Sequence, residues 1–152
     1  MLEQLTTFII TAKKATYIVS KSPVSGSRAG AHDLAYDRPP FAYCDSYFGG
    51  EDFLGQEVVW HKSTPVWAMN YYGYILRPDL ITPAQAGDTL KAALSLPHTQ
   101  GRLLDDFEFV GGHGHYAIKS QGTIAHFSGI ETIHVDRTLA YQLDYHGGLI
   151  KP

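Results

Sequence analysis

Two glutamates, Glu57 and Glu131, each stand at the centre of an alternating pattern whose other members are apolar or glycine, apart from His61 at the end of the first pattern. In a strand every second side chain points to the same face, so Glu57 shares a face with Phe53, Gly55 and Val59. Burying an unpaired carboxylate among apolar neighbours costs roughly several kcal/mol. Each glutamate therefore needs a partner, which either the protein or a ligand must supply.

The second glutamate has the same surroundings, because Glu131 shares its face with Phe127, Gly129, Ile133 and Val135. Two interpretations are open. In the structural one, each carboxylate accepts hydrogen bonds from tyrosine hydroxyls or backbone N–H groups and sets the strand register. In the binding one, the glycine two residues before each glutamate leaves room for a ligand or another backbone.

The binding interpretation predicts a pocket between the two copies, in which Glu57 holds the polar group of the ligand. Carboxylates with aromatic walls suit a cationic or polyhydroxylated small molecule. The predicted ligand-binding residues are Tyr47, Glu57, Trp67 and Tyr71, with Glu131 and Tyr145 as their counterparts.

The two copies belong to a longer repeat. The stretch FLGQEVVWHKSTPVWAMNYYGYIL, residues 53–76, aligns without a gap with FSGIETIHVDRTLAYQLDYHGGLI, residues 127–150, at an offset of 74. Two glycines, a glutamate and a tyrosine recur in fixed register, beside a phenylalanine and a threonine. Such periodic identity indicates an internal duplication.

Helices are predicted before each set of strands. Apolar residues at three- and four-residue spacing, from Leu2 to Ala12, predict an amphipathic helix over 2–15. Thr82, Pro83 and Gln85 have the types and spacing of a helix N-terminus with a capping box. The Ser-, Gly- and Pro-rich stretch 20–32 predicts a loop.

Strands are predicted at 32–36, 41–47, 55–61 and 66–72, and again at 107–110, 115–119, 124–134 and 139–145. The prolines in DRPP (37–40) and KSTP (62–65) are expected to make turns.

These elements predict an α+β fold in which each half is a helix followed by about four antiparallel strands. The chain is expected to form a single domain, 1–152, built of two pseudo-repeats at about 1–76 and 77–152. Its helices would pack on a curved antiparallel sheet. The sequence leaves open whether the halves share one sheet or form two.

Composition narrows the class of partner. The net charge is −3 over 152 residues, and lysines and arginines are scattered, so we expect no direct nucleic-acid partner. The only cysteine is Cys44, which suits a reducing cytoplasm. The apolar N-terminal run is short and lacks a basic flank, so neither a signal peptide nor membrane contact is expected. A homodimer is compatible with the sequence.

Two histidines could bind a metal ion. His113 and His115 have a spacing that suits metal ligands, with Glu131, His126 or Asp33 as completions. Nothing specifies the third ligand, so no metal site is predicted, and no cofactor is specified.

Three further motifs favour plain structural roles. Cys44 is more typical of a small core residue than of a nucleophile. The neighbours His32 and Asp33 point to opposite faces of a strand, which disfavours an acid–base pair. The FGGEDF stretch, residues 48–53, is best explained as a hairpin connection.

Several segments carry a family resemblance. The segments AHDLAY, DSYFGGEDFLGQEVVW and PVWAMNYYG, with the ending YQLDYHGGLI, resemble a bacterial family of domains of unknown function. The resemblance runs from about residue 30 to the end. Members occur alone or behind an XRE-type helix-turn-helix, which implies a sensor or effector-binding role. This chain departs from the fused members, because residues 2–15 predict a single helix, and the family implies no reaction.

The leading hypothesis is therefore a small-molecule-binding domain of sensor or accessory type. One alternative is an enzyme in which Glu57 or Glu131 acts as general acid or base. Another is a protein–protein interaction module that presents its tyrosines to a partner.

Overall fold

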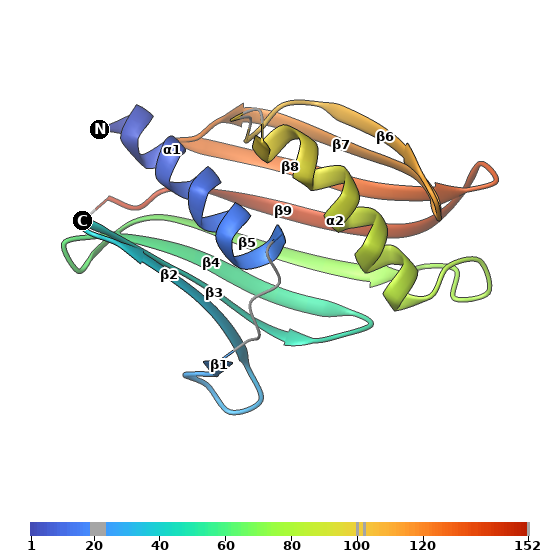
Figure 1. The fold of residues 1–152 in the computed structure, drawn as a ribbon, viewed down its shortest axis with the longest axis horizontal. Helices are drawn as coiled ribbons and strands as arrows, with labels where there is room; N and C mark the ends of the chain where they lie inside the picture. The colour runs from blue at the N-terminus through green and yellow to red at the C-terminus, as the bar shows by residue number, and fades with distance from the viewer. Residues whose placement is uncertain (19–23, 100, 102, 152) are drawn as a thin grey trace.

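The computed structural model describes residues 1–18, 24–99, 101 and 103–151. Two helices and one antiparallel sheet make up the fold (Figure 1). The first half contains α1 (Leu2–Lys13), the π-helical turn η1 (Lys14–Ile18), β1 (Val24–Ser25), β2 (His32–Arg38), β3 (Phe41–Gly49), β4 (Phe53–His61) and β5 (Thr64–Ile75). The second half contains α2 (Pro83–Thr99), β6 (Phe107–Gly111), β7 (Gly114–Thr123), β8 (His126–Val135) and β9 (Thr138–Leu149).

Both helices form where the apolar spacing predicts them. Leu5, Phe8, Ile9 and Ala12 of α1 are buried, whereas Leu2 at its first position is exposed. The predicted helix over 2–15 ends earlier as an α-helix, at Lys13, and continues as η1.

The start of α2 is the predicted capping box. The Thr82 N–H donates to Gln85 Oε1 at 2.9 Å, and the Gln85 N–H donates to Thr82 Oγ1 at 3.3 Å. Ala86, Leu90 and Ala93 then bury one side of the helix against the sheet.

The two halves share one nine-stranded sheet, in the order β1-β2-β3-β4-β5-β9-β8-β7-β6. They join where β5 pairs with β9, and Tyr71 lies directly opposite Tyr145 in that pairing. These two tyrosines are repeat counterparts, separated by 74 positions. The pseudo-twofold axis that relates the halves therefore passes between them.

The duplicated hairpins agree in backbone detail. Each has a register shift at the same place, after Val59 in the first and after Ile133 in the second. Each turn holds two residues at positive φ: 48° and 68° at residues 62 and 63, then 47° and 67° at residues 136 and 137. Two consecutive left-handed residues form the turn that suits a two-residue hairpin. The expectation that proline makes the KSTP turn is wrong, because Pro65 lies within β5.

The structure confirms the α+β class and the helix-then-strands unit in both halves. The sheet is not curled, which corrects the expected curvature. Its edges, β1 and β6, stand at opposite ends of the strand order and do not pair, so the sheet stays open. Of the loop predicted at 20–32, residues 20–23 lie outside the described residues, and 24–25 form β1.

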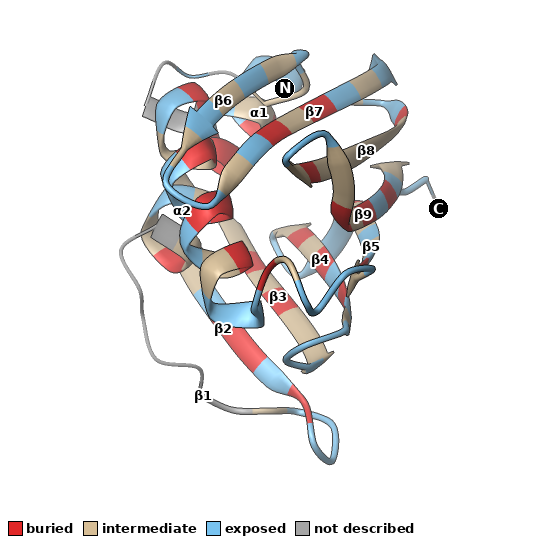
Figure 2. Ribbon diagram, turned by 90° about the vertical axis from the view of Figure 1, so that its right-hand side faces the viewer, coloured by how far each residue is buried: buried red, intermediate tan, exposed pale blue. Residues whose placement is uncertain are grey.

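Both helices cover the same face of the sheet (Figures 1 and 2). The fully buried residues of this inner face include the repeat counterparts Val59 and Ile133 and the large rings of Trp67, Tyr116 and Tyr141. None of the helices in the described part of the chain is both long and apolar enough to cross a membrane.

The outer face carries a row of polar side chains. Gln56 Nε2 donates to Asn70 Oδ1 at 2.9 Å, and Gln121 Nε2 donates to Ser128 Oγ at 2.8 Å. Each member of the row stands opposite the next on a neighbouring strand: Ser46, Gln56, Asn70, His146, Ser128 and Gln121. The two glutamates of the repeat and the apolar residues that alternate with them therefore point to the helix-covered face.

Candidate functional site

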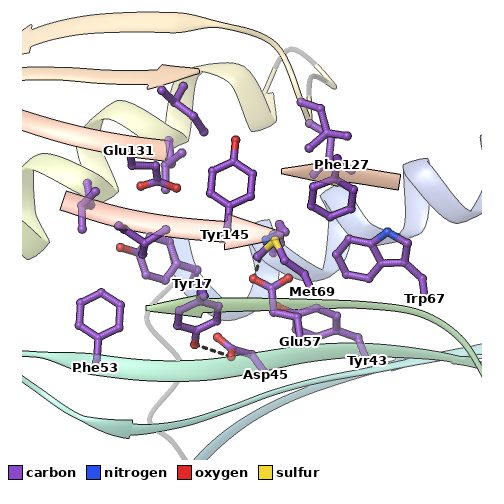
Figure 3. A pocket seen from close by; sticks show the side chains of 18 residues that line it. Tyr17, Tyr43, Asp45, Phe53, Glu57, Trp67, Met69, Phe127, Glu131 and Tyr145 are labelled. Atoms are coloured by element: carbon purple, nitrogen blue, oxygen red, sulfur yellow. Dashed lines mark hydrogen bonds and ion pairs between the residues drawn. The ribbon is translucent and has the colours of Figure 1, made fainter. Parts of the chain in front are cut away.

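A pocket lies between the inner face of the sheet and the two helices, with a volume of about 150 Å³ (Figure 3). Residues from α1, η1, α2, the segment after α2 and six strands line it. Most of the lining is apolar. Its polar members are Lys13, Asp45, Glu57, Glu131 and the tyrosines at 17, 43, 71 and 145.

Glu57 forms an ion pair with Lys13, the last residue of α1. Lys13 Nζ lies 2.6 Å from Glu57 Oε1, and the two side chains are 15% and 7% exposed. The other oxygen, Glu57 Oε2, is buried and has no hydrogen-bond partner among the described residues. Burial and the Glu57 carboxylate raise the pKa of Tyr43, whose hydroxyl interacts with that carboxylate.

Asp45 brings a second carboxyl group beside the first. It stands directly opposite Glu57 in the β3–β4 pairing, so both side chains point to the inner face. The Tyr71 hydroxyl donates to Asp45 Oδ1 at 2.6 Å. Burial and the neighbouring Glu57 carboxylate raise the pKa of Asp45 to about 7, and the Tyr71 hydrogen bond and Lys13 offset only part of that rise.

Glu131 is the third carboxyl group, placed by β8. Burial raises its pKa to about 7, which the Lys13 ammonium and the Tyr116 hydroxyl partly offset. The Glu57 carboxylate adds to the rise. The carboxyl groups of both halves therefore influence one another across a single pocket, and two of them titrate near neutral pH.

The glycines before each glutamate do not leave open space. A Cβ at Gly55 would meet the ring of Tyr71, and a Cβ at Gly129 would meet the ring of Tyr145. Each tyrosine stands opposite its glycine on the neighbouring strand. The expectation of ligand room at the glycines is thus wrong, since tyrosine rings fill it and the pocket lies beyond them.

Five of the six predicted binding residues line the pocket: Glu57, Trp67, Tyr71, Glu131 and Tyr145. Tyr47 does not, because its ring packs beside His32, with the centroids 5.2 Å apart. Trp67 is 1% exposed, and its Nε1 donor has no partner within the described part of the chain.

Three polar residues of the site were not predicted: Lys13, Tyr17 and Asp45. Lys13 suits the C-terminal end of the α1 dipole, which does not indicate a contact with Glu57, and Tyr17 belongs to η1, which no spacing pattern predicted. Asp45 could have been found, since pairing 41–47 with 55–61 as a tight hairpin sets Asp45 opposite Glu57.

The remaining candidates lie away from the pocket. His115 is exposed and lies 3.2 Å from Glu108, and His113 is in the β6–β7 turn. Because His115 and Glu131 face opposite sides of the sheet, they cannot share a metal ion, and the described residues contain no metal-ligating cluster. Burial raises the pKa of the Cys44 thiol to about 11, which disfavours a nucleophilic role. FGGEDF forms the β3–β4 connection, as expected.

Comparison with protein families shows which family the chain belongs to. A family described as Domain of unknown function (DUF5680) matches residues 45–150, well over half of the chain. The chain belongs to this family. The DUF5680 match spans both duplicated hairpins and begins at Asp45, so it includes all three carboxyl groups. Lys13 and Tyr17 precede it. No curated protein and no solved structure matches the chain.

Proposed function

We propose that the chain is a small-molecule-binding domain of sensor or accessory type, whose ligand occupies the pocket between the sheet and the helices. The supporting observation is the convergence of Asp45, Glu57 and Glu131 on one apolar cavity. Glu57 Oε2 is a buried acceptor to which no described residue donates a hydrogen bond. Concave, mostly apolar sites with a few polar groups are typical of small-molecule binding.

The structural interpretation of the glutamates explains only part of this arrangement. Lys13 compensates Glu57, and the Tyr71 hydroxyl serves Asp45. Neither Asp45 nor Glu131 has an ion-pair partner of its own in the described part of the chain. Burial raises the pKa of both acids, so their ionisation costs free energy at neutral pH, and such groups cluster at functional sites.

The resemblance to bacterial domains that occur alone or behind XRE-type helix-turn-helix regulators favours a sensor role over a metabolic one. A cytoplasmic location is part of the same proposal and is motivated by the lone cysteine. An interaction module receives less support, because Tyr43, Tyr116, Tyr141 and Tyr145 are all buried.

An acid–base enzyme is the second candidate. A general acid or base works best when its pKa lies near the operating pH. Asp45 and Glu131, each with a pKa raised to about 7, meet that condition. Asp45 and Glu131 are therefore the residues that we propose as general acid or base if the protein is an enzyme. Conversion of a bound compound, followed by mass spectrometry, separates enzyme from sensor.

Thermal unfolding against a metabolite library tests the binding proposal. We would compare wild type with Glu57→Gln and with Glu51→Gln, a matched control at an exposed glutamate. A ligand at a hundredfold excess over its Kd stabilises the folded state by about 2.7 kcal/mol. The shift should appear in wild type and the control and be absent from Glu57→Gln. If Glu57→Gln is too unstable to melt cooperatively, Glu131→Gln takes its place. No shift with any compound, or the same shift in every variant, would contradict the proposal.

A further inference from the structure

We infer that the ligand is a compact protonated amine, with its ammonium among the carboxyl groups of Asp45, Glu57 and Glu131 and its apolar body against the aromatic wall. This inference rests on the proposed binding function and specifies the class of its ligand.

The charge balance of the pocket points to a cation. The lining contains three carboxyl groups and one cationic side chain, Lys13, among the described residues. When all three carboxyls are ionised, the pocket carries an excess of two negative charges in an apolar setting. An anionic ligand would add to that excess, whereas an ammonium offsets half of it. The tyrosines of the lining cannot supply the missing positive charge, because a tyrosine side chain is either neutral or negative.

Lys13 shows how an ammonium is held there. Its Nζ lies 2.6 Å from Glu57 Oε1, with the side chain only 15% exposed. Glu57 Oε2 is enclosed and makes no hydrogen bond within the described residues, and the Tyr43 hydroxyl interacts with the same carboxylate, so a second donor reaches this oxygen only if neighbouring side chains move. A ligand ammonium has three N–H groups, so it can donate to more than one of the carboxyl groups that line the pocket.

The walls and volume limit the rest of the ligand. A cavity of about 150 Å³ has the volume of an engineered protein cavity that admits benzene. Its sides are the rings of Phe53, Trp67 and Phe127 and the side chains of Met69, Leu90 and Leu143. Aromatic faces attract cations as well as apolar groups. A polyol of the same size would bury several hydroxyls against carbon, so these walls favour an amine with an aliphatic or aromatic body.

Proton release should accompany amine binding. Asp45 and Glu131 are partly protonated near pH 7, because burial raises the pKa of each. A nearby ammonium favours the ionised forms, so the bound ligand displaces protons. The charged and titratable groups that interact electrostatically with Asp45 are Lys13, Tyr17, Asp33, Tyr43, Cys44, Tyr47, Glu57 and Tyr71. Those that face Glu131 are Lys13, Tyr17, Glu57, Tyr116, Tyr141 and Tyr145.

Three probes of one shape test the charge requirement: 3-methylbutylamine, 3-methylbutanol and 3-methylbutanoate. Each is titrated into the full chain by calorimetry at pH 7, in two buffers of different ionisation enthalpy. The amine should bind at least tenfold more tightly than the alcohol, with an apparent enthalpy that differs between buffers because protons are released. The carboxylate should show no binding. Glu131→Gln and Asp45→Asn should each weaken the amine more than the alcohol, while Glu51→Gln changes neither.

The outcomes separate this inference from the function on which it rests. Equal binding of alcohol and amine, or tighter binding of the alcohol, overturns the amine inference and leaves a small-molecule pocket. The same holds if no probe binds while another library compound stabilises wild type but not Glu57→Gln. If no probe binds and no library compound stabilises the protein, both proposals fail. Should a carboxyl variant not fold, the amine-to-alcohol comparison on wild type alone decides the question.

Discussion

The two halves of the sheet place the same glutamate and the same tyrosine on equivalent strands, yet they give them different neighbours. Glu57 faces Asp45 across β3 and β4, whereas Glu131 faces Ile118 across β7 and β8. In the first half, α1 supplies an ammonium to the carboxylate. In the second half, α2 contributes only leucines to the pocket. Duplication thus repeats the position of the acid, and the strands and helices packed around it determine its charge.

The tyrosines on the pseudo-twofold axis differ in the same way. Both rings fill the space above a glycine on the neighbouring strand. The hydroxyl of Tyr71 donates to the carboxyl of Asp45, whereas the hydroxyl of Tyr145 bonds to the hydroxyl of Ser120. The ring is the shared structural element, and the partner of its hydroxyl distinguishes the halves. The first half therefore has one ion-paired carboxylate beside a carboxyl group hydrogen-bonded to Tyr71, and the second half has an acid without its own cation.

The largest difference between the halves should appear when Lys13 is removed. Lys13→Met keeps the aliphatic stem but leaves Glu57 buried without its ammonium. Breaking a buried ion pair on one side typically costs about 3–5 kcal/mol. We expect a loss of that order in the free energy of unfolding, measured by denaturant titration at pH 7. Lys14→Met is the matched control, since Lys14 is exposed. Equal losses of unfolding free energy in Lys13→Met and Lys14→Met would show that the ion pair does not stabilise the first half.

A pH series on Glu131→Gln should give the next largest effect. A carboxyl whose folded pKa is raised binds more protons in the folded than in the unfolded state, between about pH 4 and pH 7. Stability therefore falls as pH rises through this window, with the pKa of Glu131 raised by burial to about 7. Glu131→Gln removes this contribution, so its stability relative to wild type should rise from pH 5 to pH 8, by on the order of 1–3 kcal/mol.

The control for this series is Glu51→Gln, which should follow the wild-type pH profile throughout. Asp33 does not confuse the result, because hydrogen bonds from Ser46 and Ser27 lower its pKa. Its contribution is lost only as pH falls below about 4. Parallel profiles of Glu131→Gln and wild type would mean that the second carboxyl does not differ from an exposed one.

The smallest effects should come from the two tyrosine hydroxyls. Tyr71→Phe removes a donor to a carboxyl group, and Tyr145→Phe removes a bond between two hydroxyls. Hydrogen bonds to ionisable groups contribute more than neutral ones, so we expect losses of about 1.5 kcal/mol and about 0.5–1 kcal/mol, respectively. Both rings stay in place over their glycines. Denaturant unfolding measures the two losses, and a larger loss for Tyr145→Phe would reverse the comparison.

The repeated hairpins could be predicted from sequence because alternation and the offset of 74 reflect backbone constraints. The glutamates and their face follow from period-two geometry, and Trp67, Tyr71 and Tyr145 follow from the strand opposite. The capping box of Thr82 and Gln85 could also be predicted, since it depends on residues that are close in sequence.

The charge partners could not be predicted in the same way. Lys13 reaches Glu57 across 44 positions, and the helix pattern places it at the edge of the apolar stripe without indicating what it contacts. The space beside Gly55 and Gly129 could not be predicted either. It depends on which residue stands opposite each glycine, and that residue is known only from the register of β4 with β5 and of β8 with β9. Joining of the halves through β5 and β9 is also a long-range pairing that no local pattern encodes.

The central claim is that carboxyl groups from both halves form the polar end of one ligand pocket. A crystal structure of the protein with 3-methylbutylamine tests it most directly. The account predicts the amine nitrogen within about 2.7–3.2 Å of carboxyl oxygens of Glu57 and of Asp45 or Glu131, with the carbon chain against Trp67 and Phe127. An amine that saturates the protein in solution but lies outside this cavity in the crystal would contradict the account.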